Sequence, residues 1–156
     1  MPETIQIEGK TLTLNGLGLR KKAIIKLYVA GLYLEAASKD ATAIVAADTP
    51  RAIRMQFLRG LGKGQLVSAF REGFEKNAPE KAAAQKAAVE RFLGLVADVK
   101  QGDVVSYTYV PGKGTIIASG DREIGTIAGK EFADALFLIW LGPKPPSDDL
   151  KRGMLG

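Results

Sequence analysis

The stretch from Leu14 to Glu35 constrains the fold of this chain more than any other segment. It begins with the glycine-rich run Gly16-Leu17-Gly18 and passes through Arg20 into a long series of mostly apolar residues. Glycine tolerates the backbone conformations that tight turns need, so we expect a turn at the glycines. We expect a long β-strand to follow from Ala23, with the turn delivering Arg20 to its start.

Side chains alternate along a strand, so this segment should have two different faces. We expect the first face to be buried, because its members are all apolar or small: Ala23, Ile25, Leu27, Val29, Gly31 and Tyr33. The second face mixes Lys26 and Tyr28 with apolar neighbours. That mixture is typical of one wall of a ligand cleft, and equally of a strand near the edge of a sheet.

The rest of the chain alternates between strand-like and helix-like segments. We expect a hairpin (4–7 and 10–14), helices (40–47, 65–77, 81–96 and 129–140), strands (51–59, 104–110, 115–118 and 123–127) and a short helix capped by Ser147. The order predicts a single α+β domain, residues 1–156, with a mainly antiparallel sheet. Val29, Phe57 and Trp140 should be buried in it.

The run Gly60–Gln65 lacks the glycine spacing of phosphate-binding loops, so we expect a flexible connection there.

Composition excludes several kinds of chemistry. The chain of 156 residues contains no cysteine and no histidine, so thiol nucleophiles, disulfides, histidine bases and most zinc sites are not expected. The net charge of +5 comes from basic residues that are interspersed with acidic ones, as in a solvated surface. We therefore expect no nucleic-acid partner, no metal and no cofactor. No apolar run approaches the ~20 residues of a membrane span.

Ordered motifs give the chain a resemblance to a known family. They are Gly16-x-Gly18-x-Arg20, Ile25-Lys26 with Gly31-x-Tyr33-Leu34-Glu35, Ser68 to Asn77, Gly102-Asp103 to Tyr109-x-Pro111-Gly112-x-Gly114-Thr115, and Ile139-Trp140-Leu141-Gly142 followed by Asp149-Leu150-Lys151. In this order they resemble the chalcone isomerase fold family, and its bacterial chalcone-isomerase-like branch more than the plant enzymes. The resemblance implies an open-faced β-sandwich, in which a large antiparallel sheet is covered by helices with a ligand cleft between them. Bacterial relatives often carry an export signal, so we expect a periplasmic or exported protein, and otherwise a cytoplasmic one.

The resemblance also implies a set of ligand-binding residues. By motif, the substrate-steering arginine falls at Arg20 and the helix asparagine at Asn77. The strand threonine of the plant enzymes falls at Tyr28, their helix tyrosine at Phe70, and a late Ser or Thr at Ile139. Asn77 precedes Ala78-Pro79, so a helix-end role is as well supported as a place in the cleft. For Arg20 the alternative is a surface arginine in a turn.

Two of these differences from the plant enzymes remove a polar group from the expected site. Phe70 has no hydroxyl to relay a proton, and Ile139 cannot bind a phenol oxygen, whereas loss of one well-placed donor already costs about 2.7–4 kcal/mol. We therefore predict a non-catalytic protein that binds a small apolar acid, either fatty-acid-like or an aromatic carboxylate, with Arg20 as the anchor. Two alternatives stay open. One is an isomerase or lyase acting on a phenolic or enone substrate, with Arg20 as the electrophile and Tyr28 as the proton donor. The other is an interaction domain with a vestigial pocket.

Overall fold

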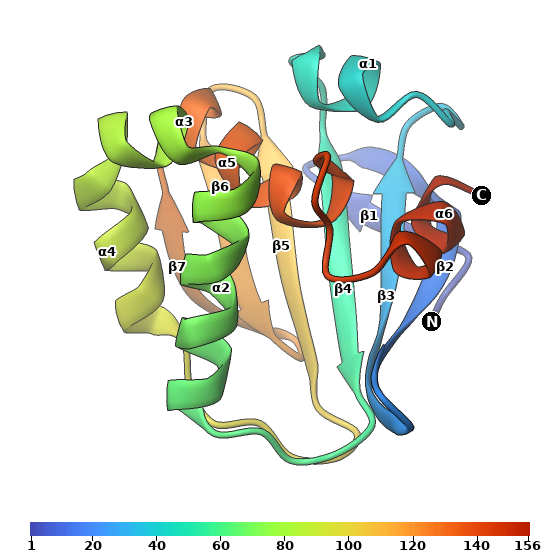
Figure 1. Cartoon of the computed structure of the whole chain (residues 1–156). Helices are drawn as coiled ribbons and strands as arrows, with labels where there is room; N and C mark the ends of the chain where they lie inside the picture. Colours follow the sequence, from blue (N-terminus) through green and yellow to red (C-terminus); the bar gives the residue numbers. More distant parts are fainter.

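Seven strands pair strictly in chain order into one antiparallel sheet in the computed structural model, which describes residues 1–156 (Figure 1). The strands are β1 (Thr4–Ile7), β2 (Lys10–Lys22), β3 (Ile25–Leu34), β4 (Arg51–Phe57), β5 (Val104–Val110), β6 (Gly114–Ser119) and β7 (Arg122–Ile127). The helices are α1 (Ala41–Ala46), α2 (Lys63–Asn77), α3 (Pro79–Ala84), α4 (Lys86–Leu95), α5 (Lys130–Leu141) and α6 (Asp148–Leu155). The predicted α+β class and antiparallel sheet are confirmed.

Helices α2, α4, α5 and α6 lie over one face of the sheet (Figure 1). The main core fills the space between the two layers and includes Phe57 and Trp140, which are buried as predicted. Aromatic rings dominate its centre, where Phe70 meets Phe92, Tyr107 and Trp140 edge to face. On the other face a small cluster of Leu12, Tyr33 and Ala52 is covered by the first residues of the chain and by β1. This arrangement is the open-faced sandwich that the resemblance implies.

The predicted turn at Gly16 and Gly18 is wrong, because both residues lie inside the single long strand β2. Helix α6 packs directly on their backbone. A Cβ atom at Gly16 would stand 2.2 Å from the carbonyl oxygen of Gly153, and one at Gly18 would stand 2.4 Å from that of Leu150. The glycines therefore allow close approach of a helix to the strand. The actual turn is formed by Ala23 and Ile24, so Arg20 belongs to β2 and lies opposite Tyr28 on β3.

The predicted burial of β3 is wrong for the half nearest that turn. Ile25 is exposed and Val29 is only half-buried. Strand β1 pairs with β2 only at Lys10 to Thr13, which is the end away from this turn. Further along, Gly31 is covered by Leu14 and Met1, and Tyr33 is fully buried. The mixed face that carries Tyr28 turns inward and joins the main core.

The remaining differences concern helices. Residues 81–96 form two helices, α3 and α4, which are separated at Gln85 because α3 packs on α5 whereas α4 packs on β7. The predicted cap at Ser147 is confirmed, since its side chain accepts a hydrogen bond from Leu150 N. Helix α1 is capped by Asp40, whose side chain accepts from Ala43 N. No helix in the structure combines the length and the apolar character that crossing a bilayer requires.

Candidate functional site

A cleft of about 370 Å³ opens between the paired strands β2 and β3 and helix α2, and it is closed on a third side by the loop that follows α5. Its volume lies in the lower range for small-molecule sites. Its lining is Arg20, Lys22, Leu27, Tyr28, Met55, Leu61, Gln65, Leu66, Ser68, Ala69, Phe70, Glu72, Gly73, Lys76, Ile139, Trp140, Lys144, Pro145 and Pro146. Four predicted residues, Arg20, Tyr28, Phe70 and Ile139, thus share one cavity, although their contact with a ligand stays a prediction.

A β-bulge positions the strand residues of this cleft. Arg20 pairs with Tyr28, but the next pair is Lys21 with Lys26, so Leu27 is an extra residue in β3. A bulge disrupts the strict alternation of side chains and re-aims one of them. Leu27 and Tyr28, which are neighbours in sequence, therefore both line the cleft.

Tyr28 supplies a buried hydroxyl at the inner end of the cleft. Its oxygen accepts a hydrogen bond from Trp140 Nε1 at 3.2 Å. Burial raises the pKa of Tyr28 to about 12, although the Trp140 hydrogen bond and the charge of Arg20 both act to lower it. The hydroxyl is therefore protonated at neutral pH. Since its oxygen already accepts from Trp140, its own proton is free to be donated to a ligand.

Arg20 lines the same cleft from β2 and forms no ion pair with a carboxylate of the chain. Its Nη1 donates only to the carbonyl of the adjacent Lys21, at 2.7 Å. The side chain of Arg20 is half-buried, and neither Tyr28 nor Asn77 accepts a hydrogen bond from it. Most of its donors are left for solvent or for a ligand.

Three lysines add positive charge at the mouth of the cleft: Lys22, Lys76 and Lys144, all exposed. The single carboxylate in the lining, Glu72, lies 2.6 Å from Lys76 Nζ. The hydrogen bond from Lys76 lowers the pKa of Glu72, and the charges of Lys22 and Arg20 contribute to the same shift. The mouth is therefore net positive and favours an anionic group.

The floor of the cleft is apolar. Phe70 and Ile139 are buried there beside Trp140 and Met55. Leu66 and Phe70 also line a second, smaller cavity of about 50 Å³, whose walls include Phe92, Tyr107 and the segment that follows α4. The two side chains thus stand between the cleft and a second cavity that is lined mostly by hydrophobic residues. No group of acidic side chains in the structure is arranged to hold a metal ion.

Comparisons with known proteins establish the family and the fold of this chain. The sequence profile of the family described as "Chalcone isomerase-like" matches residues 1–156. The chain belongs to the chalcone isomerase-like family. The structure is similar to the crystal structure of a fatty-acid binding protein from Arabidopsis thaliana, with a TM-score of 0.69, 16% sequence identity and coverage of 98% of this chain and 96% of that chain. At that identity the likeness shows the fold alone. A search of curated proteins finds no match.

In this chalcone isomerase-like chain Asn77 does not line the cleft. Its amide nitrogen donates to the carbonyls of Gly73 and Lys144, and its amide oxygen accepts from Lys144 N at 2.7 Å. Placing Asn77 in the cleft is therefore wrong for this structure, and its helix-end role is the one observed. It ties the end of α2 to the loop whose Lys144 and Pro145 form one wall of the cleft, so it acts on the cavity through that loop.

Sequence reasoning missed the polar residues of the cleft. On α2 these are Ser68, Gln65, Glu72 and Lys76, and the last three lie together with Ala69 along a single stripe of the helix. The stripe next to it carries Leu66, Phe70, Phe74 and Asn77, which are buried. Spacings of three, four and seven residues place a set of side chains on one side of a helix. That signal was available, but polar stripes on a helix usually face solvent.

Proposed function

We propose that this protein binds a fatty-acid-like or aromatic carboxylate in the cleft and does not convert it chemically. One observation carries the proposal: Arg20, with most of its donors unused, lies beside the protonated hydroxyl of Tyr28 above an apolar floor. A guanidinium presents paired donors in the geometry that a carboxylate accepts. A cavity with one charged anchor and apolar walls suits an amphiphilic acid.

The positions of charged and apolar groups set the direction of the ligand. Its carboxylate takes the end at Arg20, where Lys22 adds to the positive potential, and accepts a hydrogen bond from Tyr28. Its tail lies against Phe70, Ile139 and Trp140. The A. thaliana protein that shares this fold is a fatty-acid binding protein, which supports a ligand of this chemical class.

The side chains between the cleft and the second cavity limit the length of the ligand tail. Leu66 and Phe70 stand between the second cavity and the cleft, so a short tail stops at their side chains. Phe70 is held edge to face against Phe92 at 5.0 Å between ring centroids, which makes its displacement costly. Phe70→Ala should join the two spaces and shift the preferred ligand toward longer chains.

The lining argues against the isomerase alternative. Phe70 and Ile139 carry no hydroxyl, and a Tyr28 with a pKa of about 12 holds its proton too tightly to act as an efficient acid at neutral pH. In an absorbance assay of chalcone cyclisation we expect no acceleration over buffer. Turnover that disappears in Arg20→Ala would establish the isomerase reading in place of binding alone.

A matched pair of ligands tests the anchor. Decanoate and decanol have the same chain length and differ at the head group, and each is used to displace a fluorescent fatty acid from the protein. We expect decanoate to compete at least tenfold better, because only the carboxylate makes charge-assisted hydrogen bonds to Arg20. Equal competition, or no binding of the fluorescent probe, would support the vestigial-pocket alternative.

A further inference from the structure

The turn between β2 and β3 is the most apolar exposed point of the molecule. Three large hydrophobic side chains of the chain are exposed, and two of them are at this turn: Ile24, which is 91% exposed, and Ile25, which is 43% exposed. A single exposed isoleucine needs no explanation. Two adjacent exposed isoleucines at the tip of a projecting hairpin do need an explanation, because nothing in the fold covers them.

The residues of this turn go against local preference. Ala23 has a φ of +56°, in the left-handed region of backbone conformation. That conformation is energetically unfavourable for any residue with a Cβ atom. Two-residue hairpin turns favour glycine, asparagine or aspartate, whereas this one contains Ala23 and Ile24. A branched apolar residue here contributes nothing to the turn itself. Its physical role must therefore lie outside the fold.

The tip is also strongly basic. From Arg20 to Lys26 the chain has four cationic residues and no acidic one. Lys21 and Lys26 face each other as register partners across the hairpin, and both are exposed. Like charges directly opposite one another destabilise a strand pair. The hairpin thus holds two lysines together at a cost in its own stability.

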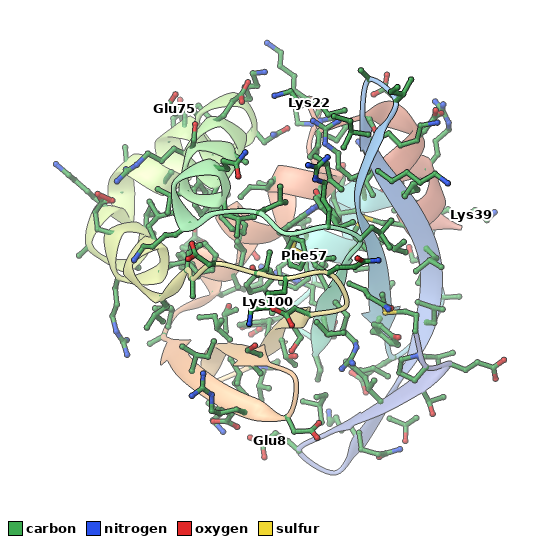
Figure 2. All side chains as sticks on the ribbon, turned by 90° about the horizontal axis from the view of Figure 1, so that it is seen from below. Glu8, Lys22, Lys39, Phe57, Glu75 and Lys100 are labelled. Atoms are coloured by element: carbon green, nitrogen blue, oxygen red, sulfur yellow. The ribbon has the colours of Figure 1, made fainter.

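Few acidic groups offset this charge. Glu72 on α2 is the carboxylate that responds to Lys22 and Arg20, and it is already engaged by Lys76. Figure 2 shows Lys22 beside the hairpin, on the side that faces α2. Since Lys22 and Arg20 also line the cleft, the mouth of the cavity and the tip of the hairpin adjoin.

We propose that this hairpin tip docks on an anionic lipid bilayer. Ile24 and Ile25 enter the boundary between head groups and acyl chains, and Lys21, Lys22 and Lys26 contact lipid phosphates. Exposed apolar side chains flanked by lysines are the combination that binds such surfaces. A protein partner is a poorer fit, because two side chains at a narrow tip provide far less than the ~800 Å² that each partner buries in a stable interface.

Docking in this way would bring the mouth of the cleft to the bilayer surface. If the proposed function holds, an acid bound in the cleft passes between lipid and protein without crossing bulk water. Membrane docking itself requires no occupant in the cleft, because Ile24 and Ile25 do not line it.

The test is co-sedimentation of the protein with vesicles. Vesicles made of equal parts phosphatidylglycerol and phosphatidylcholine should bind it, vesicles of phosphatidylcholine alone should bind it far less, and high salt should release it. Each lysine near an anionic surface contributes roughly fivefold to binding, so Lys21→Gln/Lys26→Gln should lower the partition coefficient about 25-fold. Ile24→Ser should lower it roughly tenfold, and Ile24→Leu should restore it. The control Lys39→Gln/Lys86→Gln removes the same charge elsewhere and should change it little.

Equal binding by the tip variant and its control would overturn the proposal, as would equal binding to neutral and anionic vesicles. A dimer that forms in solution and is lost in Ile24→Ser, without vesicle binding, would overturn it in favour of a second copy of the chain. Fatty-acid titration in the absence of vesicles separates this proposal from the function of the cleft. Ile24→Ser should bind the acid as the wild type does, so failure of one proposal leaves the other standing.

Discussion

Two arginines on neighbouring parts of the sheet show how differently one side chain can be used. Arg51 on β4 is fully buried, and its Nη2 lies 2.7 Å from Asp134 Oδ1. Its Nη1 donates to three carbonyls near the end of α1, and its guanidinium lies over the rings of Tyr109 and Phe137. Arg20 on β2 is half-buried and donates only to the carbonyl of Lys21.

The comparison shows that the number of partners, and not burial alone, separates a structural arginine from one available to a ligand. Arg51 joins β4, α1 and α5, and Lys130 completes the network by binding both carboxylate oxygens of Asp134. Little of the hydrogen-bonding capacity of Arg51 is left for a ligand. Arg20 has the opposite character, since its donors face a cleft and the fold does not depend on them.

The largest expected effect is on stability, at Arg51. Arg51→Ala leaves Asp134 buried with Lys130 as its remaining partner and removes the three hydrogen bonds to carbonyls near the end of α1. We expect the free energy of unfolding to fall by about 3–5 kcal/mol, the usual cost of breaking a buried ion pair. Urea denaturation followed by tryptophan fluorescence measures it, because Trp140 lies in the core.

The matched control for that measurement is Arg20→Ala, which should change the unfolding free energy by no more than about 0.5 kcal/mol. The double variant Arg51→Met/Asp134→Leu removes both charges and should regain much of the loss. Similar destabilisation by Arg51→Ala and Arg20→Ala would remove the distinction between the two arginines.

The second effect concerns ligand affinity, at Arg20. Arg20→Ala should weaken binding of a fluorescent fatty acid by about 2 kcal/mol, roughly thirtyfold, because a charge-assisted contact is lost. Arg20→Lys should recover only part of it, since an ammonium group lacks the paired donors. Arg122→Ala, on the exposed start of β7, serves as the control with unchanged affinity. Equal affinity in wild type, Arg20→Ala and Arg20→Lys would show that Arg20 is not the anchor.

Asn77 offers an intermediate case that sharpens the comparison. Asn77→Ala removes the hydrogen bonds to Lys144 and should lower the unfolding free energy by about 1.5 kcal/mol. Affinity for the fatty acid should fall less, because only the loop that forms one wall is loosened. If Asn77 instead contacted the ligand, affinity would fall as in Arg20→Ala while stability stayed unchanged.

Much of the fold follows from the sequence, because alternation, caps and turn residues act locally. Ser147 caps its helix as expected, and the three strands between Val104 and Ile127 form where they are expected. The glycines at 16 and 18 were misjudged because their role depends on α6, a segment more than 120 positions away along the chain. A local pattern cannot show whether a glycine serves a turn or the close approach of a distant helix.

The candidate site was predictable only in part, for similar reasons. The resemblance identified Arg20 and Tyr28, but the bulge at Leu27 and the wall formed by Lys144 depend on pairing and loop packing. The burial of Arg51 was not foreseen, since the sequence does not show that Asp134, 83 positions away, is its partner. Burial of charge is decided by partners that only the fold brings together.

Tyr28 should contribute less to ligand affinity than Arg20. Tyr28→Phe keeps the ring and its packing on Phe57, whose centroid is 5.8 Å away, but removes the hydroxyl that can donate to a carboxylate. We expect affinity for the fatty acid to fall by about 1 kcal/mol, roughly fivefold. The same titration measures it. A change as large as that in Arg20→Ala would make the hydroxyl an equal anchor, and no change would place the carboxylate at the lysines of the rim.

The smallest expected effect is the response of affinity to pH, which should be close to zero between about pH 6 and pH 9. Burial raises the pKa of Tyr28 to about 12, so its hydroxyl stays protonated over this range, and the guanidinium of Arg20 stays charged. A fatty acid is ionised throughout, and the chain has no histidine to titrate. The same raised pKa affects folding stability only at high pH. Because folding raises the pKa of Tyr28, its contribution to stability is complete below about pH 10 and is lost as the pH rises toward 12. Affinity measured at each pH in wild type and Tyr28→Phe should therefore give two parallel flat lines. A step in affinity near neutral pH would require a ligand-binding group that titrates there. Such a step would contradict the assignment of Arg20 and Tyr28 as the anchors.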